Sequence, residues 1–233
     1  YLHRLPKTYV ATFLLGRSSP TEDIDGPVTE LPNAPAPEPA QIEAAVQKFV
    51  GRIQQRPPAY SAVRLGGRRA YELARKGHQP ELERREVEVY RMEVRSYAYP
   101  ELTLEIQCSS GTYVRSLGRD LAESLGTAAV MSALVRTSIG QFRIEDALPP
   151  ERLNADSISQ HLLPAADAVS MLPRVELTDE EIARLRNGLA IAKPDAPQAE
   201  EIAGLDAKGR LVALLATAAP RVLRPLRNFA ANQ

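Results

Sequence analysis

The sequence predicts an α+β fold, because segments that alternate like β-strands stand between segments with helical periodicity. Residues 7–15 and 102–109 alternate between two sets of side chains, which is the period of a strand. Residues 39–50 and 113–125 repeat apolar side chains every three to four positions, as amphipathic helices do. A length of 233 residues suits one large domain and one small domain.

The first strand is expected at residues 7–15. Its two faces carry Tyr9, Ala11, Phe13 and Leu15, and Thr8, Val10, Thr12 and Leu14. Because both sets are largely apolar, we expect a strand in a sheet that is covered on both faces. A polar corner follows at residues 18–26, where Asp23, Asp25 and Gly26 favour turns.

The helix at residues 39–50 is expected to begin at Pro39, because proline is favoured at the first helical position. Gly51 is expected to end it. Its apolar stripe consists of Ile42, Val46, Phe49 and Val50.

Further strands are expected beyond residue 86. The apolar alternation moves by one position, which predicts a β-bulge, between two sets of side chains: Val87 and Val89, then Tyr90, Met92 and Val94. Residues 102–109 direct one set inward, namely Leu102, Leu104, Ile106 and Cys108. Cys108 is therefore expected to be a small core residue and not a nucleophile.

Ser110 and Gly111 are expected to turn the chain into the second helix, which ends at Gly126. Its apolar stripe consists of Val114, Leu117, Leu121 and Leu125. We expect a further helix or helical turn near residues 127–135 and a strand at residues 138–144.

A domain boundary is expected near residues 164–173. Beyond it, Thr178-Asp179-Glu180-Glu181 has the form of a capping box, and the helix it opens should stop at Asn187-Gly188. Residues 202–205 and 211–215 have the pattern of a β-hairpin around residues 206–209. One helix and several short strands predict a small β-rich module.

Composition argues against several classes of protein. No apolar run approaches the eighteen residues of a membrane span, and nothing at Tyr1 resembles a signal peptide. The single cysteine allows no intramolecular disulfide, so a reducing cytoplasm is the expected location. With one cysteine and three histidines, we expect no bound metal.

Charge is concentrated locally although the net charge of the chain is zero. Residues 64–85 hold seven cations and three anions, a local excess of four positive charges. Arginines interleaved with tyrosines suit phosphate oxygens and base faces. A solvated charged hairpin has the same composition, so charge alone leaves both interpretations open.

Residues 57–75 match the pattern Pro-Pro-x-Tyr-Ser-Ala-x-basic-x-x-Gly-x-basic-x-Tyr-x-x-Ala-Arg, with Arg64 where lysine is more usual. The pattern resembles the insertion, or thumb, of TruB-type tRNA pseudouridine synthases. Further matches follow in family order: Lys7-Thr8-Tyr9, Asp23-Ile24-Asp25-Gly26, Gly111-Thr112-Tyr113-Val114-Arg115, Leu134-Val135-Arg136 with Gly140, and Leu223-Arg224-Pro225-Leu226-Arg227-Asn228-Phe229. The resemblance covers nearly the whole chain.

The resemblance implies a catalytic domain at residues 1–165 with a mixed, mainly antiparallel sheet. The thumb would span about residues 56–86, and a small PUA-like RNA-binding domain would span residues 173–233. The implied enzyme is of bacterial type and isomerises uridine to pseudouridine at position 55, in the T-loop of tRNA.

The same resemblance implies the T-arm of tRNA as the partner, no membrane, no metal, and a monomeric state. The reaction breaks the C1′–N1 bond and rejoins the base through C5. It needs no redox change and no energy input, so no cofactor is implied.

One part of the family pattern is missing. Such enzymes carry a catalytic aspartate in a Gly-x-Leu-Asp-Pro-type motif ahead of the position that matches Tyr9, and this sequence contains no Leu-Asp-Pro. Asp23 and Asp25 follow Tyr9 and fit a different part of the pattern. We therefore expect a chain that lacks the family's N-terminal segment and is inactive by itself.

The resemblance assigns four active-site residues. Arg115 matches the arginine that pairs with the catalytic aspartate, which suits a planar guanidinium. A surface arginine is the alternative, although the positive helix N-terminus makes a cation unfavourable there. Tyr9 matches the tyrosine that stacks on the target base, Tyr113 is expected near the nucleotide, and Leu134 matches an apolar wall of the pocket. Spacing alone would make Tyr9 and Leu134 core residues.

The expected RNA-binding residues lie in the thumb: Tyr60, Arg64, Arg68, Arg69, Tyr71, Arg75 and Lys76. The target base must be extruded from the stacked T-loop at a cost of a few kcal/mol. Recognition would then be mainly of RNA shape.

Three other interpretations stay open. A pure RNA-binding or chaperone module would keep the thumb and the C-terminal domain without catalysis, and the aspartate segment separates it from the enzyme. A dyskerin-like, guide-dependent relative is disfavoured, because those enzymes lack this basic thumb. A small-metabolite enzyme predicts no protection of the chain by tRNA.

Overall fold

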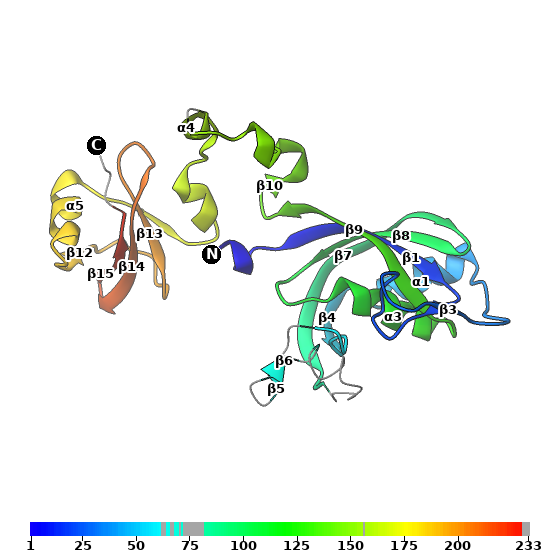
Figure 1. The fold of residues 1–233 in the computed structure, drawn as a ribbon. Coiled ribbons are helices and arrows are strands. Elements are labelled where there is room, and N and C mark those ends of the chain that lie inside the picture. The colour runs from blue at the N-terminus through cyan, green and yellow to red at the C-terminus, as the bar shows by residue number, and fades with distance from the viewer. Residues whose placement is uncertain (62–63, 66–67, 70, 72–81, 156, 230–233) are drawn as a thin grey trace. The chain divides into compact units, whose positions relative to one another are not determined.

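The computed structural model describes residues 1–61, 64–65, 68–69, 71, 82–155 and 157–229 (Figure 1). The chain divides into two compact units, one formed by His3–Ala147 and the other by Tyr1–Leu2 with Leu148–Gln233. None of the helices in the described ranges combines the length and the apolar composition that a bilayer-spanning helix requires.

The first unit is built on a six-stranded sheet in which every strand pairing is antiparallel. Its strands lie in the order β10 (Phe142–Arg143), β9 (Ala129–Ile139), β1 (Lys7–Leu15), β8 (Glu101–Cys108), β7 (Arg85–Ala98) and β4 (Gly51–Gln55). The parallel pairs that a mixed sheet would contain are not found between these strands. The strand expected at residues 7–15 is confirmed and lies inside the sheet, between β8 and β9.

Two helices pack on one face of this sheet (Figure 1). The helix α1 (Pro39–Gln47) has Pro39 in its first turn, and α3 (Val114–Ser124) is followed by Gly126 at a φ of +74°, as expected. They bury the alternating side chains of β1 and β8 in one core. A Cβ atom on Gly118 of α3 would overlap the ring of Phe13, so this approach of helix and strand requires glycine.

The opposite face of β1 is only partly covered, so the expectation that both faces are covered is wrong. Ala11 and Phe13 are no more than 1% exposed, whereas Thr8, Val10 and Thr12 are half-buried. A polar cleft of about 600 Å³ lies beside Thr8 and Val10 on this face. Its arginines are held in ion pairs, since Arg91 and Arg95 both lie within 4.0 Å of the carboxylate of Glu105.

The bulge expected in β7 is confirmed, because the register with β8 shifts between Val89 and Arg91. Its inward residues are Val87, Val89 and Met92. Tyr90 was expected among them but is 44% exposed. The extra residue of the bulge turns Tyr90 outward and returns Met92 to the core.

The helix expected near residues 127–135 is wrong, because β9 occupies this range. Ala129, Val130 and Met131 are buried, and β9 pairs with β1 from Ala129 to Ile139. Pairing with a strand more than a hundred residues earlier overrides the local helical preference of alanine, methionine and leucine. The strand expected at residues 138–144 is in fact the end of β9 and the short β10.

Short elements complete the first unit. β2 (Arg17–Ser18) pairs with β3 (Thr29–Glu30), and β5 (Arg64–Leu65) pairs with β6 (Arg68–Arg69) within the predicted thumb. Among the described residues, η1 (Leu2–Arg4) and η2 (Ile144–Asp146) are 3₁₀ turns at the two ends of this unit, and η3 (Pro150–Arg152) and η4 (Ala165–Val169) are 3₁₀ turns of the second unit.

The second unit holds a five-stranded sheet in the order β11 (Arg174–Glu176), β13 (Ile202–Leu205), β14 (Leu211–Ala219), β15 (Val222–Asn228) and β12 (Ile191–Ala192). The hairpin of β13 and β14 is confirmed, and the pair β11–β13 is parallel. The helices α4 (Ile158–His161) and α5 (Asp179–Arg186) belong to this unit. The capping box of α5 is present, with Thr178 and Glu181 exchanging hydrogen bonds.

The division between the units falls after Ala147, ahead of the prolines that suggested a boundary at residues 164–173. Ala166 and Val169 explain the difference. Both are buried in a cluster with Ala203, Leu211 and Leu214 of the second sheet, so η4 packs with the second unit.

Candidate active site

The N-terminus of α3 is fixed by a buried glutamine. Gln55, at the end of β4, is 1% exposed. Its Nε2 donates to the carbonyl oxygen of Tyr113 at 3.0 Å, and its Oε1 accepts from the backbone N–H of Tyr113 at 2.8 Å. This two-way exchange satisfies the backbone N–H of Tyr113 and ties the end of β4, next to the predicted thumb, to the start of the helix.

Arg115 lies in the first turn of α3 and holds two other segments by their carbonyl groups. Its Nη1 donates to Thr21 O at 3.0 Å, and its Nη2 donates to Tyr60 O at 3.2 Å. A guanidinium has five N–H donors, so donors remain for a carboxylate. Arg115 therefore joins the corner loop (residues 19–26) to the base of the predicted thumb (residues 56–61).

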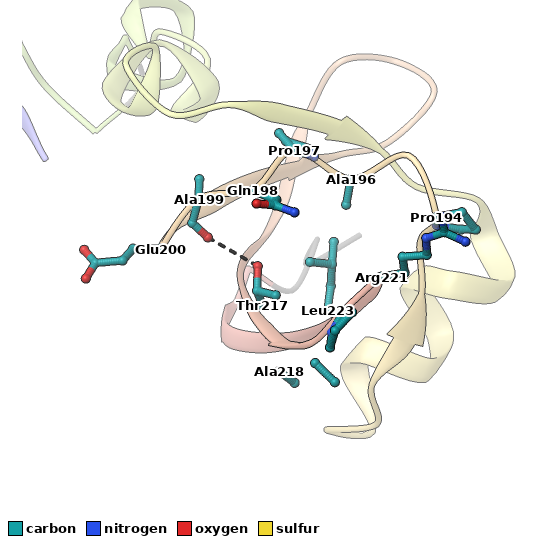
Figure 2. Close-up of a pocket in the computed structure, with 12 residues that line it drawn as sticks. Pro194, Ala196, Pro197, Gln198, Ala199, Glu200, Thr217, Ala218, Arg221 and Leu223 are labelled. Atoms are coloured by element: carbon teal, nitrogen blue, oxygen red, sulfur yellow. Dashed lines mark hydrogen bonds between the residues drawn. The ribbon is translucent and has the colours of Figure 1, made fainter.

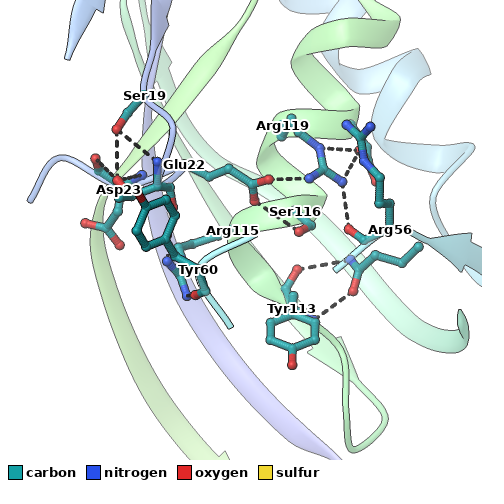
Figure 3. A network of polar contacts seen from close by, with 12 residues as sticks. Ser19, Glu22, Asp23, Arg56, Tyr60, Tyr113, Arg115, Ser116 and Arg119 are labelled. Carbon is teal, nitrogen blue, oxygen red and sulfur yellow. Dashed lines mark hydrogen bonds and ion pairs between the residues drawn. The ribbon is translucent and has the colours of Figure 1, made fainter. Parts of the chain in front are cut away.

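One turn later, Arg119 makes the second connection between the same segments (Figure 3). Its Nη1 forms an ion pair with Glu22, its Nη2 donates to Arg56 O at 2.8 Å, and its Nε donates to Asp120 Oδ1 at 2.8 Å. Ser116 Oγ, on the same helix, donates to the other oxygen of Glu22 at 3.0 Å. Burial raises the pKa of Glu22, against the opposing effect of Arg119 and Ser116.

The corner loop is ordered by its own short side chains. Ser19 and Thr21 hydroxyls lie 2.8 Å apart, and Thr21 Oγ1 donates to Asp23 O at 3.1 Å. A Cβ on Gly26 would overlap both hydroxyls, so glycine is required there. The backbone of the loop also joins β9, with Ile24 N–H donating to Met131 O at 2.9 Å and Met131 N–H donating to Glu22 O at 3.0 Å.

Tyr9 lies on β1, opposite Arg136 of β9, and packs against the core on the helix-bearing face of the sheet. Burial raises the pKa of the Tyr9 phenol, and a hydrogen bond with Arg136 partly offsets this. The phenol is therefore protonated at neutral pH. Leu134, opposite Ala11 on β9, is 42% exposed, so in the described part of the chain it is not enclosed by a pocket.

The predicted RNA-binding residues are described to different extents. Tyr60 is half-buried beside Arg115, and the backbone N–H of Tyr71 donates to Ser61 O at 3.1 Å. Arg64, Arg68 and Arg69 lie on the β5–β6 hairpin, where Arg64 is the register partner of Arg69. Arg75 and Lys76 lie outside the described residues.

Sequence reasoning missed four residues of this network: Gln55, Ser116, Arg119 and Glu22. Arg119 stands four positions after Arg115, and residues so spaced share one face of a helix, so this signal was available. Glu22 gave none. It adopts a φ of +60°, a left-handed conformation that sequence seldom reveals for glutamate.

Other candidate chemistry is not supported by the described residues. Cys108 is 1% exposed, and burial raises the pKa of its thiol, which makes it a core residue as expected. Within the described ranges, no three histidine, cysteine or acidic side chains gather where they could hold a metal ion.

A cavity of about 840 Å³ lies in the second unit, between residues 194–200 and the turn that joins β14 to β15 (Figure 2). Alanines and prolines make up most of its lining. Thr217 Oγ1 donates to Ala199 O at 3.3 Å across it. The cavity contains none of the predicted active-site residues, so the candidate active site is the α3 network of the first unit.

The family model for the N-terminal domain of TruB family pseudouridylate synthases matches residues 1–114. The chain is similar to the tRNA pseudouridine synthase B of Xanthomonas campestris pv. campestris (strain B100), with 39% identity over 229 residues, which cover 96% of this chain and 74% of the relative. It is also similar to the enzyme of the same name from Dehalococcoides mccartyi (strain 195), with 37% identity over 92% of this chain and 73% of the relative.

Solved structures agree in fold. A Cbf5–Nop10–Gar1 complex contains a chain that matches 94% of this one with a TM-score of 0.66 and 24% identity, over 62% of its own length. A chain in the structure of an H/ACA RNP bound to a substrate RNA matches all of this chain with a TM-score of 0.69 and 21% identity, over 68% of that chain's own length. The family model and the sequence relatives show that the chain belongs to the TruB family of pseudouridine synthases.

Proposed function

We propose that this chain forms the RNA-binding part and most of the active site of a tRNA pseudouridine synthase that modifies uridine 55 in the T-loop. The observation that carries the proposal is the placement of Arg115. Two carbonyl oxygens hold its guanidinium at 3.0 and 3.2 Å and leave donors free for a carboxylate. The relatives named tRNA pseudouridine synthase B support tRNA as the substrate.

The proposed reaction breaks the C1′–N1 bond of uridine, turns the base, and joins C1′ to C5, after which C5 loses a proton and N1 holds one. The step is an isomerisation without redox change, and no cofactor is needed. Arg115 would keep the attacking carboxylate ionised and oriented. Tyr9, with its protonated phenol, would support the detached base, Leu134 would supply an apolar wall, and Tyr113 would lie near the nucleotide.

The attacking carboxylate is not among the residues of the network. Both Glu22 oxygens are engaged by Ser116 and Arg119, and Asp23 Oδ1 accepts from the backbone N–H of Asp25 at 3.2 Å. The sequence contains no Leu-Asp-Pro. We therefore propose that these 233 residues alone bind the T-arm without turning it over.

The remaining parts of the proposal concern binding. The basic thumb would neutralise phosphates of the T-arm, with Tyr60 and Tyr71 beside it. The second unit, with its five-stranded sheet, would act as a PUA-like RNA-binding domain. The protein would work as a cytoplasmic monomer. A non-catalytic RNA-binding or chaperone module is the second candidate, favoured by the missing Leu-Asp-Pro motif.

One experiment separates the two candidates. The chain is fused behind the N-terminal segment of a tRNA pseudouridine synthase B that carries the Leu-Asp-Pro-type motif, and release of tritium from T-arm RNA carrying 5-tritiated uridine is measured. The enzyme proposal predicts release by the fusion and none by the chain alone, with comparable tRNA binding by both. A fusion that binds tRNA and releases no tritium would favour the non-catalytic module.

A further inference from the structure

We propose that Glu22 and Arg119 are positioning residues, which act together to set the guanidinium of Arg115. The inference rests on the proposed function only in taking Arg115 as the residue whose placement matters. It concerns two side chains outside the expected active-site set, and it follows from the way the corner loop and the thumb base meet at α3.

Among the described residues, the hydrogen-bond partners of Arg115 are two backbone carbonyls, so its guanidinium depends on where those carbonyls lie. One belongs to Thr21 in the corner loop and the other to Tyr60 at the thumb base. Neither segment belongs to a helix or a strand. Besides the hydrogen bonds within the corner loop and to β9, each segment is held to α3 by side chains near its carbonyl.

The pair of Glu22 and Arg119 supplies both anchors. Glu22 is the residue next to Thr21, and its carboxylate is held by Arg119 and by Ser116 Oγ at 3.0 Å. The same guanidinium donates to Arg56 O at 2.8 Å, four residues before Tyr60. Arg115 and Arg119, four positions apart on α3, thus donate to the carbonyls of Tyr60 and Arg56, which are four positions apart on the thumb base. The ion pair of Arg119 with Glu22 connects the same helix to the corner loop (Figure 3).

The conformation of Glu22 supports a functional role. Its φ of +60° lies in the left-handed region, which is costly for a residue with a Cβ. Its side chain and that of Arg119 are only 12% and 11% exposed, so a charge is kept out of water as well. Strain and buried charge persist where the surrounding structure holds them, and such sites are frequently functional.

The carbonyl contacts can be read directly in the 233-residue chain. Rotation of the Nη groups of Arg115 is slow when they are hydrogen-bonded, and arginine side-chain NMR observes it, with Arg115→Lys assigning the signal. Amide hydrogen exchange at Ile24 and Met131 reports the corner loop, since these two amides form the hydrogen bonds between the loop and β9. Exchange at Tyr71, which donates to Ser61 O, reports the thumb base.

The main variant is Glu22→Gln, which keeps the size of the side chain and removes its charge. We expect Arg115 to rotate freely and exchange at Ile24 and Met131 to accelerate at least about tenfold, because charge-assisted hydrogen bonds are removed. Arg119→Lys keeps a charge for Glu22 but cannot also reach Arg56 O. It should therefore accelerate amide exchange at Tyr71 and leave amide exchange at Ile24 within about twofold of the parental rate.

The matched control is Asp120→Asn. Asp120 contacts the same guanidinium at 2.8 Å, but neither the corner loop nor the thumb base contains it, so its loss leaves Arg119 with Glu22 and Arg56 O as partners. We expect Arg115 and all three amides to behave as in the parent. A melting curve for each variant ensures that folded proteins are compared.

In the fusion described above, Glu22→Gln should lower the single-turnover rate at least about tenfold and change tRNA affinity less than about twofold. Arg115 mobility and loop exchange that stay at parental values in Glu22→Gln would overturn the inference, whatever the fusion does. Increased mobility with a parental single-turnover rate would also overturn it, because the pair would then be structural only. A parental fusion without activity would count against the proposed function, while the NMR result would still decide the positioning of Arg115.

Discussion

Glu22 and Arg119 form an ion pair in which neither side chain is more than 12% exposed. A pair so buried costs desolvation energy that its attraction must offset. The balance is visible in Glu22, because burial raises the pKa of its carboxyl although a guanidinium and a hydroxyl contact it. The raised pKa means that the carboxyl of Glu22 takes up a proton more readily in the folded protein than in the unfolded chain.

This shift fixes the sign of a pH effect. The pKa of Glu22 lies above its ordinary value of 4.5, so between these values the folded state binds more protons than the unfolded state. The stability linked to Glu22 is present below the ordinary value and is lost as pH rises through the raised pKa. Glu22→Gln removes this loss. We therefore expect the midpoint temperature of unfolding of Glu22→Gln to rise relative to that of the parent as pH increases.

Thermal unfolding of Glu22→Gln and the parent at several pH values from 4.5 to 8 measures this trend. Asp120→Asn is the control, since Asp120 touches the same arginine from a less buried position. A midpoint difference that is constant with pH, or that turns against the variant as pH rises, would show that burial does not dominate the titration of Glu22.

Packing of α3 on the sheet gives a second prediction. Gly118→Ala should destabilise the first unit by about 1–3 kcal/mol through overpacking against Phe13, although alanine favours a helix. Denaturant unfolding measures the change. Phe13→Leu in the same chain should recover part of the loss. If Gly118→Ala alone is neutral or stabilising, helix and strand do not approach as closely as described.

The basic thumb gives a third prediction. Replacing Arg64, Arg68 and Arg69 by alanine should weaken tRNA binding and flatten its salt dependence by roughly 0.7–0.9 for each phosphate that is no longer neutralised. The midpoint of unfolding should hardly move, because surface changes usually stay within about 0.5 kcal/mol. Filter binding between low and high salt measures affinity and slope.

The control for the thumb removes the same charge elsewhere in the first unit, at exposed Lys48, Arg52 and Arg143. It should change the salt slope much less. Equal reductions in both triple variants would mean that general charge, and not the thumb, attracts tRNA.

Some of this architecture could be predicted from local pattern. The alternation of β1 and β8, the glycine after α3, the burial of Cys108 and the capping box of α5 each depend on neighbouring residues in the sequence. The strand β9 could not be predicted from local pattern, because its partner β1 lies more than a hundred residues away and the sequence of β9 suits a helix. The exposure of Tyr90 depends on where the bulge falls, which alternation alone places only within a residue or two.

The candidate site divides in the same way. Arg115, Tyr9 and Tyr113 were indicated by short motifs, and the structure places Arg115 and Tyr113 in one hydrogen-bonded network. Glu22 was not predictable, because its role arises from a left-handed turn and from contacts with α3, ninety-four and ninety-seven positions away. Such contacts have no signature in a single sequence.

The role of Arg115 is the centre of the account, and turnover in the fusion tests it most directly. Arg115→Lys keeps the charge but loses the fork that could hold Thr21 O, Tyr60 O and a carboxylate together, so it should be far more damaging than a conservative change. Arg115→Met also leaves the carboxylate without a counter-ion, which favours its protonation.

The deciding measurement is the single-turnover rate of Arg115→Met with excess enzyme on T-arm RNA. We predict a rate at least about a hundredfold below the parental fusion, with RNA affinity changed less than about twofold. A parental rate in Arg115→Met would contradict the account, because Arg115 would then be a structural cation on the surface of α3.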